Sequence, residues 1–356
     1  MINFTVGPVQ SDEYVRDIGA ENTPYFRTAE FSQIMLENEH LMNEFIEAGD
    51  GARTVFITGS GTAAMEAAVM NTLTASDKAL VVNGGSFGAR FAKLCHIHGI
   101  GCTEIKLEPG QALTGEILSE YDNRGYTAFL VNMCETSTGV LYDMNLISSF
   151  CQKNGLFLIV DAVSAFIANE IHMSAWGIDV VITASQKALA VPPGVSIVML
   201  GKRALERVYN NECSCMYFDI KDMLTNGERG QTPFTPAVTT LLQINARLRR
   251  LKEIGFANET RRIAEQAADF RSRLTGLPFE YLSQSPANSV TALKTVGCSA
   301  GTIFNTLKDE YGIWICPNGG EMADTVFRVG HIGALTHEDN AKLVEAFHDL
   351  IKRNII

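Results

Sequence analysis

The sequence predicts an α/β protein whose larger part is a mainly parallel sheet of seven strands, and two observations predict this class. Seven short apolar runs lie between residues 50 and 200, and several are apolar at consecutive positions, as in strands covered on both faces. Helical segments alternate with these runs, which is the pattern of strand–helix–strand units. The runs are "TVFIT" (54–58), "KALVVNG" (78–84), "TEIKLE" (103–108), "AFLVNMCE" (128–135), "LFLIVDAV" (156–163), "VVITAS" (180–185) and "SIVML" (196–200).

The helical segments complete the prediction of two domains. Between the runs, helices are expected at 61–73, 88–99 and 144–155. After residue 236 the pattern changes to two long helices, two short strands and a last helix, which indicates a smaller α+β domain. These later elements are expected at 236–255, 258–274, 289–293, 325–330 and 337–354. We therefore expect a large α/β domain over residues 15–240 and a small domain formed by 1–14 and 241–356.

Charge and composition exclude several classes of function. The chain has 29 basic and 40 acidic residues, a net charge of −11, which argues against a nucleic-acid partner. The N-terminus has no basic and apolar leader, and no apolar stretch is long enough to cross a membrane. Eight scattered cysteines without metal-ligand spacing favour reduced thiols and no bound metal. We expect a cytoplasmic protein that acts on small molecules.

The first strand end carries a candidate phosphate-binding turn. In open α/β sheets, ligands bind beyond the carboxyl ends of the strands. The run 54–58 is followed by Gly59-Ser60-Gly61-Thr62 and then at once by a helix, so small residues and a helix N-terminus would face an anion there. A dinucleotide loop is disfavoured because the next strand ends in Asn83 and Gly84, without a carboxylate for a ribose, and the Walker lysine is absent. The alternative is a plain tight turn.

Three further strand ends carry a flat ring, a carboxylate and an amine. Phe87 offers a face for stacking, although it could equally be a core residue. Asp161 closes an apolar strand, where a carboxylate is costly unless a cation such as a protonated heterocycle pairs with it; the alternative is a helix N-cap. Lys187 follows another buried strand, and it is either a lysine that snorkels to solvent or an amine poised to form a Schiff base. Together with the turn, these residues describe a site for pyridoxal phosphate, which has one phosphate, one flat ring, one basic ring nitrogen and one aldehyde.

Eight motifs resemble one family in its order along nearly the whole chain. They are "FTVGPV", "GSGTAAMEA", "NGGSFGARF", "CETSTGVL", "VDAVSAF", "SQKAL", "GQTPFTPAV" and "FRVGHIG". The chain resembles the class V aminotransferases of fold type I, in particular the alanine–glyoxylate, serine–pyruvate and 2-aminoethylphosphonate–pyruvate transaminases. The resemblance implies a fold type I transferase that moves an amino group from a small donor to a 2-oxo acid.

The resemblance also implies a role for each cofactor-binding residue. Lys187 would form the Schiff base and move the proton between Cα and C4′, Asp161 would keep the ring nitrogen protonated, and Phe87 would stack on the ring. The implied phosphate ligands are Ser60, Gly61, Thr62 and Gln186. Thr138 would contact the ring or its hydroxyl, with Ser137 as a close competitor.

Other implied residues lie at the substrate or in a second subunit. Thr235 would reach the phosphate of the neighbouring subunit, which implies a homodimer with shared active sites. Arg328 would clamp the substrate carboxylate with its planar fork, and Gly7 would line the substrate site. Arg27, in a segment that the family folds over the active site, would meet either a second anionic group of the substrate or a structural ion pair, and the sequence leaves both open.

Two departures and two alternative functions remain at this stage. Many relatives have tryptophan or tyrosine in place of Phe87, and some have tyrosine in place of Thr232, so a second contact to the partner's phosphate is in doubt. A cysteine desulfurase or related lyase would need a mobile reactive cysteine, and neither Cys298 nor Cys316 lies in a recognisable loop of that kind. A non-catalytic, cofactor-bound regulator is disfavoured because no DNA-binding segment is appended.

Overall fold

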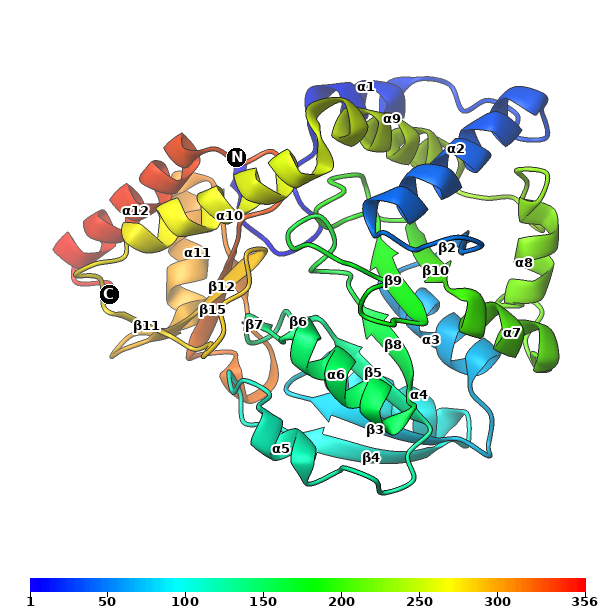
Figure 1. Ribbon diagram of the computed structural model, residues 1–356. Coiled ribbons are helices and arrows are strands. Elements are labelled where there is room, and N and C mark those ends of the chain that lie inside the picture. The colour runs from blue at the N-terminus through cyan, green and yellow to red at the C-terminus, as the bar shows by residue number, and fades with distance from the viewer.

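The computed structural model describes residues 1–356 and is built around a seven-stranded sheet (Figure 1). The strand order is β2-β10-β9-β8-β5-β3-β4, and only β10 runs against its neighbours. The strands are β2 (Arg53–Thr58), β3 (Lys78–Asn83), β4 (Gly101–Lys106), β5 (Ala128–Asn132), β8 (Phe157–Asp161), β9 (Val180–Ala184) and β10 (Val195–Leu200). This confirms the predicted mainly parallel sheet. Because six strands share one direction, their carboxyl ends meet at one edge.

The sheet is apolar on both faces because helices cover both. In β8, Phe157 and Ile159 face one core, whereas Leu158 and Val160 face the other. The first core is closed by α3 (Gly61–Thr72), α4 (Gly88–Ile97), α7 (Lys202–Asn210) and α8 (Ile220–Gly227). The second is closed by α1 (Glu13–Ala20), α2 (Ala29–Phe45), α5 (Gly115–Ser119), α6 (Met144–Asn154) and α9 (Val238–Ile254). Consecutive apolar residues in a strand therefore belong to two different cores, as expected for a covered parallel sheet.

Several helices begin and end where local chemistry requires. Asp143 accepts from the backbone N–H groups of Asn145 and Leu146 at the start of α6, and α6 ends at Gly155 with a left-handed φ of 66°. Thr336 and Asp339 form a capping box at the start of α12 (His337–Lys352). No helix in the protein is sufficiently long and apolar to cross a bilayer.

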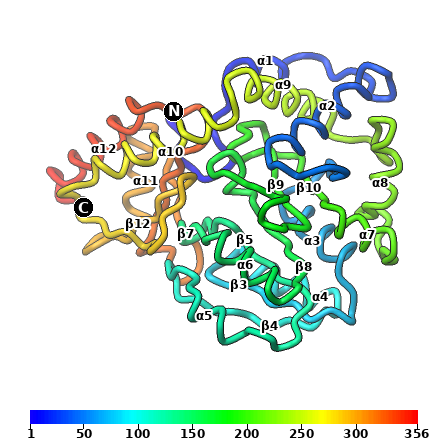
Figure 2. The backbone as a smooth tube through the Cα atoms, viewed as in Figure 1, coloured from blue at the N-terminus to red at the C-terminus, as the bar shows by residue number.

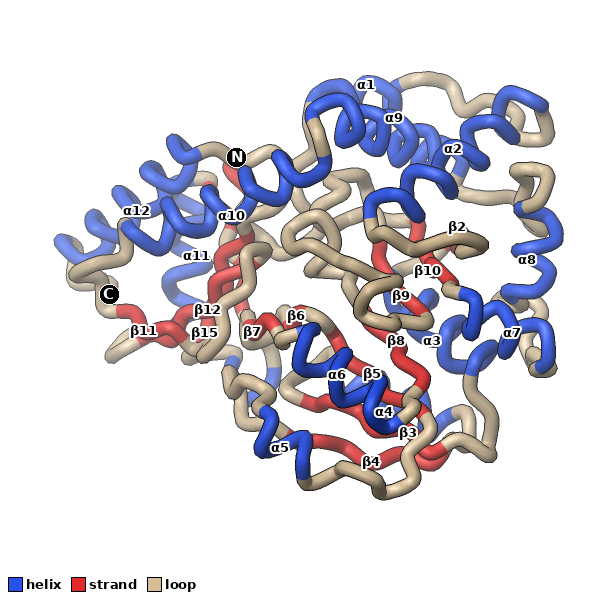
Figure 3. The backbone as a smooth tube through the Cα atoms, in the orientation of Figure 1, coloured by secondary structure: helices blue, strands red, loops and turns tan.

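A second, antiparallel sheet lies beside the large one (Figure 3). Its strands, in the order β11-β12-β15-β14, are β11 (Phe279–Tyr281), β12 (Val290–Thr295), β15 (Val326–Gly330) and β14 (Cys316–Pro317). They share a core with α10 (Phe256–Ser272), α11 (Ala300–Tyr311) and α12. The remaining short elements are the hairpin β6 (Cys134–Glu135) and β7 (Val140–Leu141), the 3-10 helix Gly320–Met322, and β1 (Ile2–Asn3), which pairs with β13 (Ile313–Trp314). The pairing of β1 brings the N-terminus to the C-terminal part of the chain (Figure 2).

The predicted domain boundary at 240/241 falls inside α9. That helix packs against α1 and α2, beside the large sheet (Figure 1). The chain passes toward the second sheet at Gly255, between α9 and α10. The packing therefore favours a boundary near Gly255, and the division into domains stays a prediction.

Candidate active site

A cavity of about 310 Å³ opens at the carboxyl edge of the large sheet. Its volume is in the range of small-molecule binding sites. The residues that line it are Gly7, Pro8, Ser60, Gly61, Thr62, Met65, Phe87, Arg90, Cys134, Thr136, Asp161, Val163, Ser164, Gln186, Lys187 and Pro193. Of the predicted site residues, the structure brings together Gly7, Ser60, Gly61, Thr62, Phe87, Asp161, Gln186 and Lys187 on this wall.

Lys187 follows β9 and points into this cavity rather than to bulk solvent. It is only 8% exposed, and its Nζ donates a hydrogen bond of 2.5 Å to the Val6 carbonyl. The N-terminal segment covers it closely: a Cβ at Gly7, where φ is +130°, would lie 2.7 Å from Lys187 Cδ. Burial, together with the positive charge of Arg328, lowers the pKa of Lys187 to about 8. The amine is therefore a stronger candidate for chemistry than for a surface role.

The lowered pKa of Lys187 predicts how the reactivity of its amine depends on pH when no ligand is bound. Only the neutral amine is nucleophilic, and its fraction rises tenfold per pH unit up to the pKa and then levels off. The rate of reductive methylation of Lys187 with formaldehyde should therefore rise from pH 6, reach half of its maximum near pH 8 and level off above that pH. Mass spectrometry of the peptide that contains residue 187 measures it. A rate that keeps rising beyond pH 10 would contradict the burial argument.

Asp161 ends β8 and is held by hydrogen bonds from two directions. Its Oδ2 accepts from Asn132 Nδ2 at 2.6 Å, across the β5–β8 pairing, and its Oδ1 accepts from the Val163 N–H at 2.8 Å. The second bond is the local turn contact expected of a cap, yet the carboxyl group also lines the cavity. Burial raises the pKa of Asp161 to about 6. A cation placed in the cavity would offset this cost, so the site favours a positively charged partner for the carboxylate.

The first turn of α3 has the properties of an anion site. Ser60 is the N-cap, but its hydroxyl makes no capping hydrogen bond and is free for a ligand. A Cβ at Gly61 would lie 3.0 Å from Val163 Cγ2, so the close packing there favours glycine. Gln186, on the same wall, has a buried amide oxygen without a hydrogen-bond partner, so its amide group is available. Free helix N–H groups and these side chains converge on one end of the cavity.

The position of Phe87 is fixed by a buried carboxylate that the sequence did not reveal. Glu135, at the end of β6, accepts from the N–H groups of Phe87 at 3.2 Å and Gly88 at 3.0 Å. The same carboxylate accepts from Ser137 Oγ at 2.5 Å. A Cβ at Gly85 would lie 2.7 Å from Glu135 Cδ, so the loop between β3 and α4 is in close contact with the β6–β7 hairpin. These hydrogen bonds hold the Phe87 ring at the N-terminus of α4.

The structure places Thr136, and not Thr138, on the wall of the cavity. Thr136 lines the cavity, where its Oγ1 lies 2.6 Å from Ser164 Oγ, whereas Thr138 is fully buried off the wall and bonds to the Glu135 carbonyl. The competitor Ser137 is engaged by Glu135. The reason is a turn after β6, in which the Thr138 N–H bonds back to Glu135 and directs the Thr138 side chain away from the cavity.

Arg328 lies behind the cavity wall rather than on it. From β15 it donates to the Thr136 carbonyl at 3.3 Å and to the Pro317 carbonyl at 2.8 Å, and its Nε is buried without a partner. Its charge nevertheless contributes to the lowered pKa of Lys187. The guanidinium is therefore close to the amine and still has hydrogen-bonding capacity.

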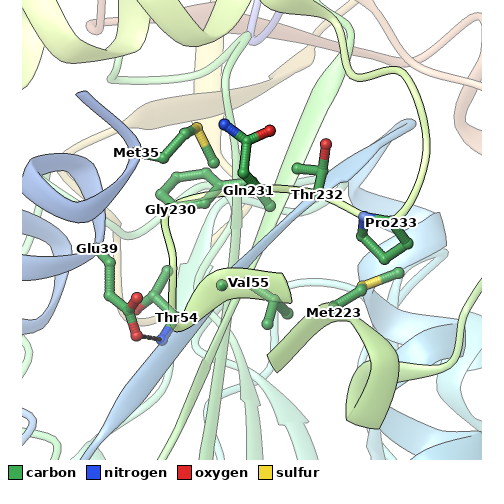
Figure 4. Close-up of a pocket in the computed structure, with 11 residues that line it drawn as sticks. Met35, Glu39, Thr54, Val55, Met223, Gly230, Gln231, Thr232 and Pro233 are labelled. Carbon is green, nitrogen blue, oxygen red and sulfur yellow. Dashed lines mark hydrogen bonds between the residues drawn. The ribbon is translucent and has the colours of Figure 1, made fainter. Parts of the chain in front are cut away.

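Two other predicted residues lie outside the cavity. Arg27 donates to Gln231 Oε1 at 3.2 Å and to the carbonyls of Thr232 at 2.9 Å and Pro233 at 3.3 Å, so its partners are neutral and no ion pair forms. Figure 4 shows these three partner residues along a small pocket of about 20 Å³. Thr235 follows them and is exposed. Neither Arg27 nor Thr235 faces the cavity of its own chain.

The wall of the cavity matches the functional groups of pyridoxal phosphate. The first turn of α3 and the free amide of Gln186 suit the phosphate, and the ring of Phe87 suits a flat heterocycle. Asp161 suits a protonated ring nitrogen, and Lys187 suits an aldehyde. Four independent groups therefore fit one ligand.

Comparison with known proteins gives the same result. The family model "Aminotransferase class-V" matches residues 11–334. The chain is 30% identical over 295 residues to an L-aspartate–glyoxylate aminotransferase of Paracoccus denitrificans, and the aligned region covers 80% of this chain and 74% of the relative. It is 29% identical over 313 residues to an alanine–glyoxylate aminotransferase of Felis catus, with coverage of 84% and 75%. A solved aspartate aminotransferase of subgroup IV from Thermus thermophilus superposes with a TM-score of 0.92 at 25% identity, over 99% of both chains. The chain therefore belongs to the class V aminotransferases, which are fold type I enzymes that depend on pyridoxal phosphate.

Proposed function

We propose that this aminotransferase moves an amino group from 2-aminoethylphosphonate, alanine or serine to glyoxylate or pyruvate, with Lys187 as its central residue. The observation that carries the proposal is the shared cavity of about 310 Å³, in which the desolvated amine of Lys187, the carboxylate of Asp161 and the N-terminus of α3 meet. Glyoxylate is the favoured acceptor, because both curated relatives described above carry it in their names.

The mechanism divides the work between the cofactor and the chain. When bound, pyridoxal phosphate supplies an aldehyde that joins to amines and a ring that withdraws electrons from the donor's Cα. Lys187 Nζ removes the proton from Cα, which its lowered pKa allows at lower pH than an ordinary lysine. Asp161, oriented by Asn132 and by the Val163 N–H, holds a proton on the ring nitrogen. The segment that contains Gly7 covers the amine and excludes water.

We further propose the set of residues that hold the cofactor. Phe87 stacks on the ring, and Thr136 takes the contact that the sequence assigned to Thr138, because only Thr136 is on the wall. The proposed phosphate ligands are Ser60, Gly61, Thr62 and Gln186. Thr235 acts in the active site of the neighbouring subunit of a homodimer, and its exposure outside its own cavity supports this role. Sedimentation of the purified protein as a monomer would count against the shared site.

Arg328 is proposed to bind the substrate carboxylate. Its planar fork makes two parallel hydrogen bonds that a lysine cannot reproduce. Arg328→Lys should therefore raise the KM for both the donor and glyoxylate by roughly 10- to 100-fold, the size of a lost charge-assisted contact. Steady-state kinetics measure both constants. Arg271→Lys, which changes another partly buried arginine bonded to backbone carbonyls, is the control and should leave both KM values unchanged.

The identity of the donor is tested by half-reactions. Purified protein should be yellow, and hydride reduction should fix the cofactor on Lys187. Alanine, serine and 2-aminoethylphosphonate are then added separately without an acceptor, and loss of the visible absorbance band identifies the donor. A protein that stays colourless and inert with added pyridoxal phosphate would remove the proposal.

The lyase alternative finds less support. Cys316 lies in β14, paired with β15, and Cys298 precedes α11, so neither belongs to a long loop over the cavity. A desulfurase needs such a mobile cysteine to reach the substrate. Release of sulfide from cysteine at a rate comparable to amino transfer would revive this alternative, and amino transfer no faster than in Lys187→Ala would revive the non-catalytic regulator.

A further inference from the structure

Arg90 lines the cavity but has no part in the mechanism described above. It lies in the first turn of α4, three residues after Phe87. Its Nη1 donates a hydrogen bond of 2.7 Å to Thr62 Oγ1, and its guanidinium carbon lies 4.8 Å from the centroid of the Phe87 ring. Two different helices therefore place this cation between the aromatic ring and the anion site of α3.

The positive charge of Arg90 has no anionic partner within the chain. The nearest carboxylate along α3 is that of Glu66, one turn beyond Thr62, and it is engaged by His98 at 3.3 Å. The hydroxyl of Thr62 and the ring of Phe87 are both neutral. A guanidinium that lines a ligand cavity with only neutral partners and free N–H groups is suited to bind an oxyanion of the ligand.

The geometry assigns this oxyanion to the phosphate rather than to the substrate. Arg90 bonds to Thr62, which lies in the first turn of α3, where free N–H groups already favour negative charge. Arg328 lies in the second sheet, and its positive charge contributes to the lowered pKa of Lys187. The protein therefore has a second arginine, close to the reactive amine, that is suited to an anionic group of the substrate. Arg90 therefore lies on the cavity wall beside the anion site, whereas Arg328 lies behind that wall.

We propose that Arg90 is a cofactor-binding residue that, together with Thr62, neutralises the phosphate of pyridoxal phosphate and makes the enzyme select the phosphorylated cofactor. The proposal rests on the proposed cofactor site. It predicts that removal of the charge weakens binding of the phosphorylated form and leaves the unphosphorylated form almost unaffected. A residue that only supports the loop of Phe87 would affect both forms equally.

The test compares two ligands and two proteins without measuring turnover. Apo protein is titrated with pyridoxal phosphate and with pyridoxal, and Kd is read from the absorbance change for the wild type and for Arg90→Gln. The expected result is a Kd for pyridoxal phosphate that rises by roughly 10- to 100-fold, with a change of less than about twofold for pyridoxal. Thr62→Val should weaken pyridoxal phosphate less, and the double variant should lose less than the product of the two single effects.

Controls separate this proposal from a folding defect and from failure of the proposed function. Arg124→Gln removes another arginine that lies over an aromatic ring, Tyr121, outside the cavity, and it should bind both ligands as the wild type does. Equal losses for the two ligands, or no loss for either, would overturn the role of Arg90. So would unchanged cofactor binding combined with a raised KM for a donor that carries a second anion, because that result would place Arg90 at the substrate. If instead the wild type binds neither ligand, the proposed function itself fails.

Discussion

Replacing Lys187 by alanine should lower the rate of amino transfer by roughly 10²- to 10⁴-fold, which is the contribution of a positioned general base. No other lysine lines the cavity, so no second amine is in place to take over the proton transfer. Because burial lowers its pKa to about 8, the amine is poised for this role at lower pH than an exposed lysine. Coupled assay of the keto acid product measures the loss.

A small added amine should restore part of the activity of the Lys187→Ala variant. Methylamine fits the space that the side chain vacates and supplies a base at the same place. Lys78→Ala is the matched control, since Lys78 begins β3 at the opposite edge of the sheet and is exposed. Activity of Lys187→Ala within tenfold of the wild type, without added amine, would show that another group moves the proton.

Replacing Asp161 by asparagine should lower kcat by roughly 10²- to 10³-fold, although the shape of the side chain hardly changes. An amide has the size of the carboxyl group, yet it carries no charge to keep a proton on the ring nitrogen. The hydrogen bonds from Asn132 and from the Val163 N–H need an oxygen acceptor, and the amide retains only one. Steady-state kinetics at saturating cofactor separate this loss from weaker binding.

Asp179→Asn provides the control for the Asp161 variant. Asp179 is also buried, its pKa is also raised to about 6 by burial, and it accepts a hydrogen bond of 2.8 Å from the Leu158 N–H. It precedes β9 and so lies at the amino edge of the sheet, far from the cavity. Its replacement should alter the melting temperature and leave kcat unchanged. If the two variants lost activity equally, the effect at Asp161 would be one of folding rather than of charge.

The sequence predicted the large sheet well because its signal is local. Each of the seven apolar runs became a strand, since consecutive apolar residues suit a strand between two cores. The helices α1, α2, α5, α7, α8 and α11 were not predicted. α7 is mostly charged and polar and α5 has only 5 residues, so their local patterns are weak, and tertiary packing supplies much of the stability of such short helices.

The structure places on the cavity wall the predicted residues that directly follow strands, whereas the predicted residue of the turn after β6 is not on that wall. Ser60, Asp161 and Lys187 come just after strands that share one direction, so parallel packing alone gathers them. Thr136 and Thr138 are two residues apart in one turn, and only the folded turn decides which of them faces the cavity. Sequence reasoning missed Glu135 and Arg90 because the contacts of Glu135 with Phe87 and of Arg90 with Thr62 join residues that are far apart in the chain.

The sequence by itself therefore determined the fold class, the family and the amine–carboxylate pair, since these depend on local patterns and on the common direction of the strands. Only the tertiary structure decided the environment of these groups: the Val6 carbonyl and Gly7 over Lys187, the hold of Glu135 on Phe87, and the contact of Arg90 with Thr62. The physical reason is that burial, electrostatic fields and hydrogen-bond partners depend on distances in space between residues that are remote in sequence.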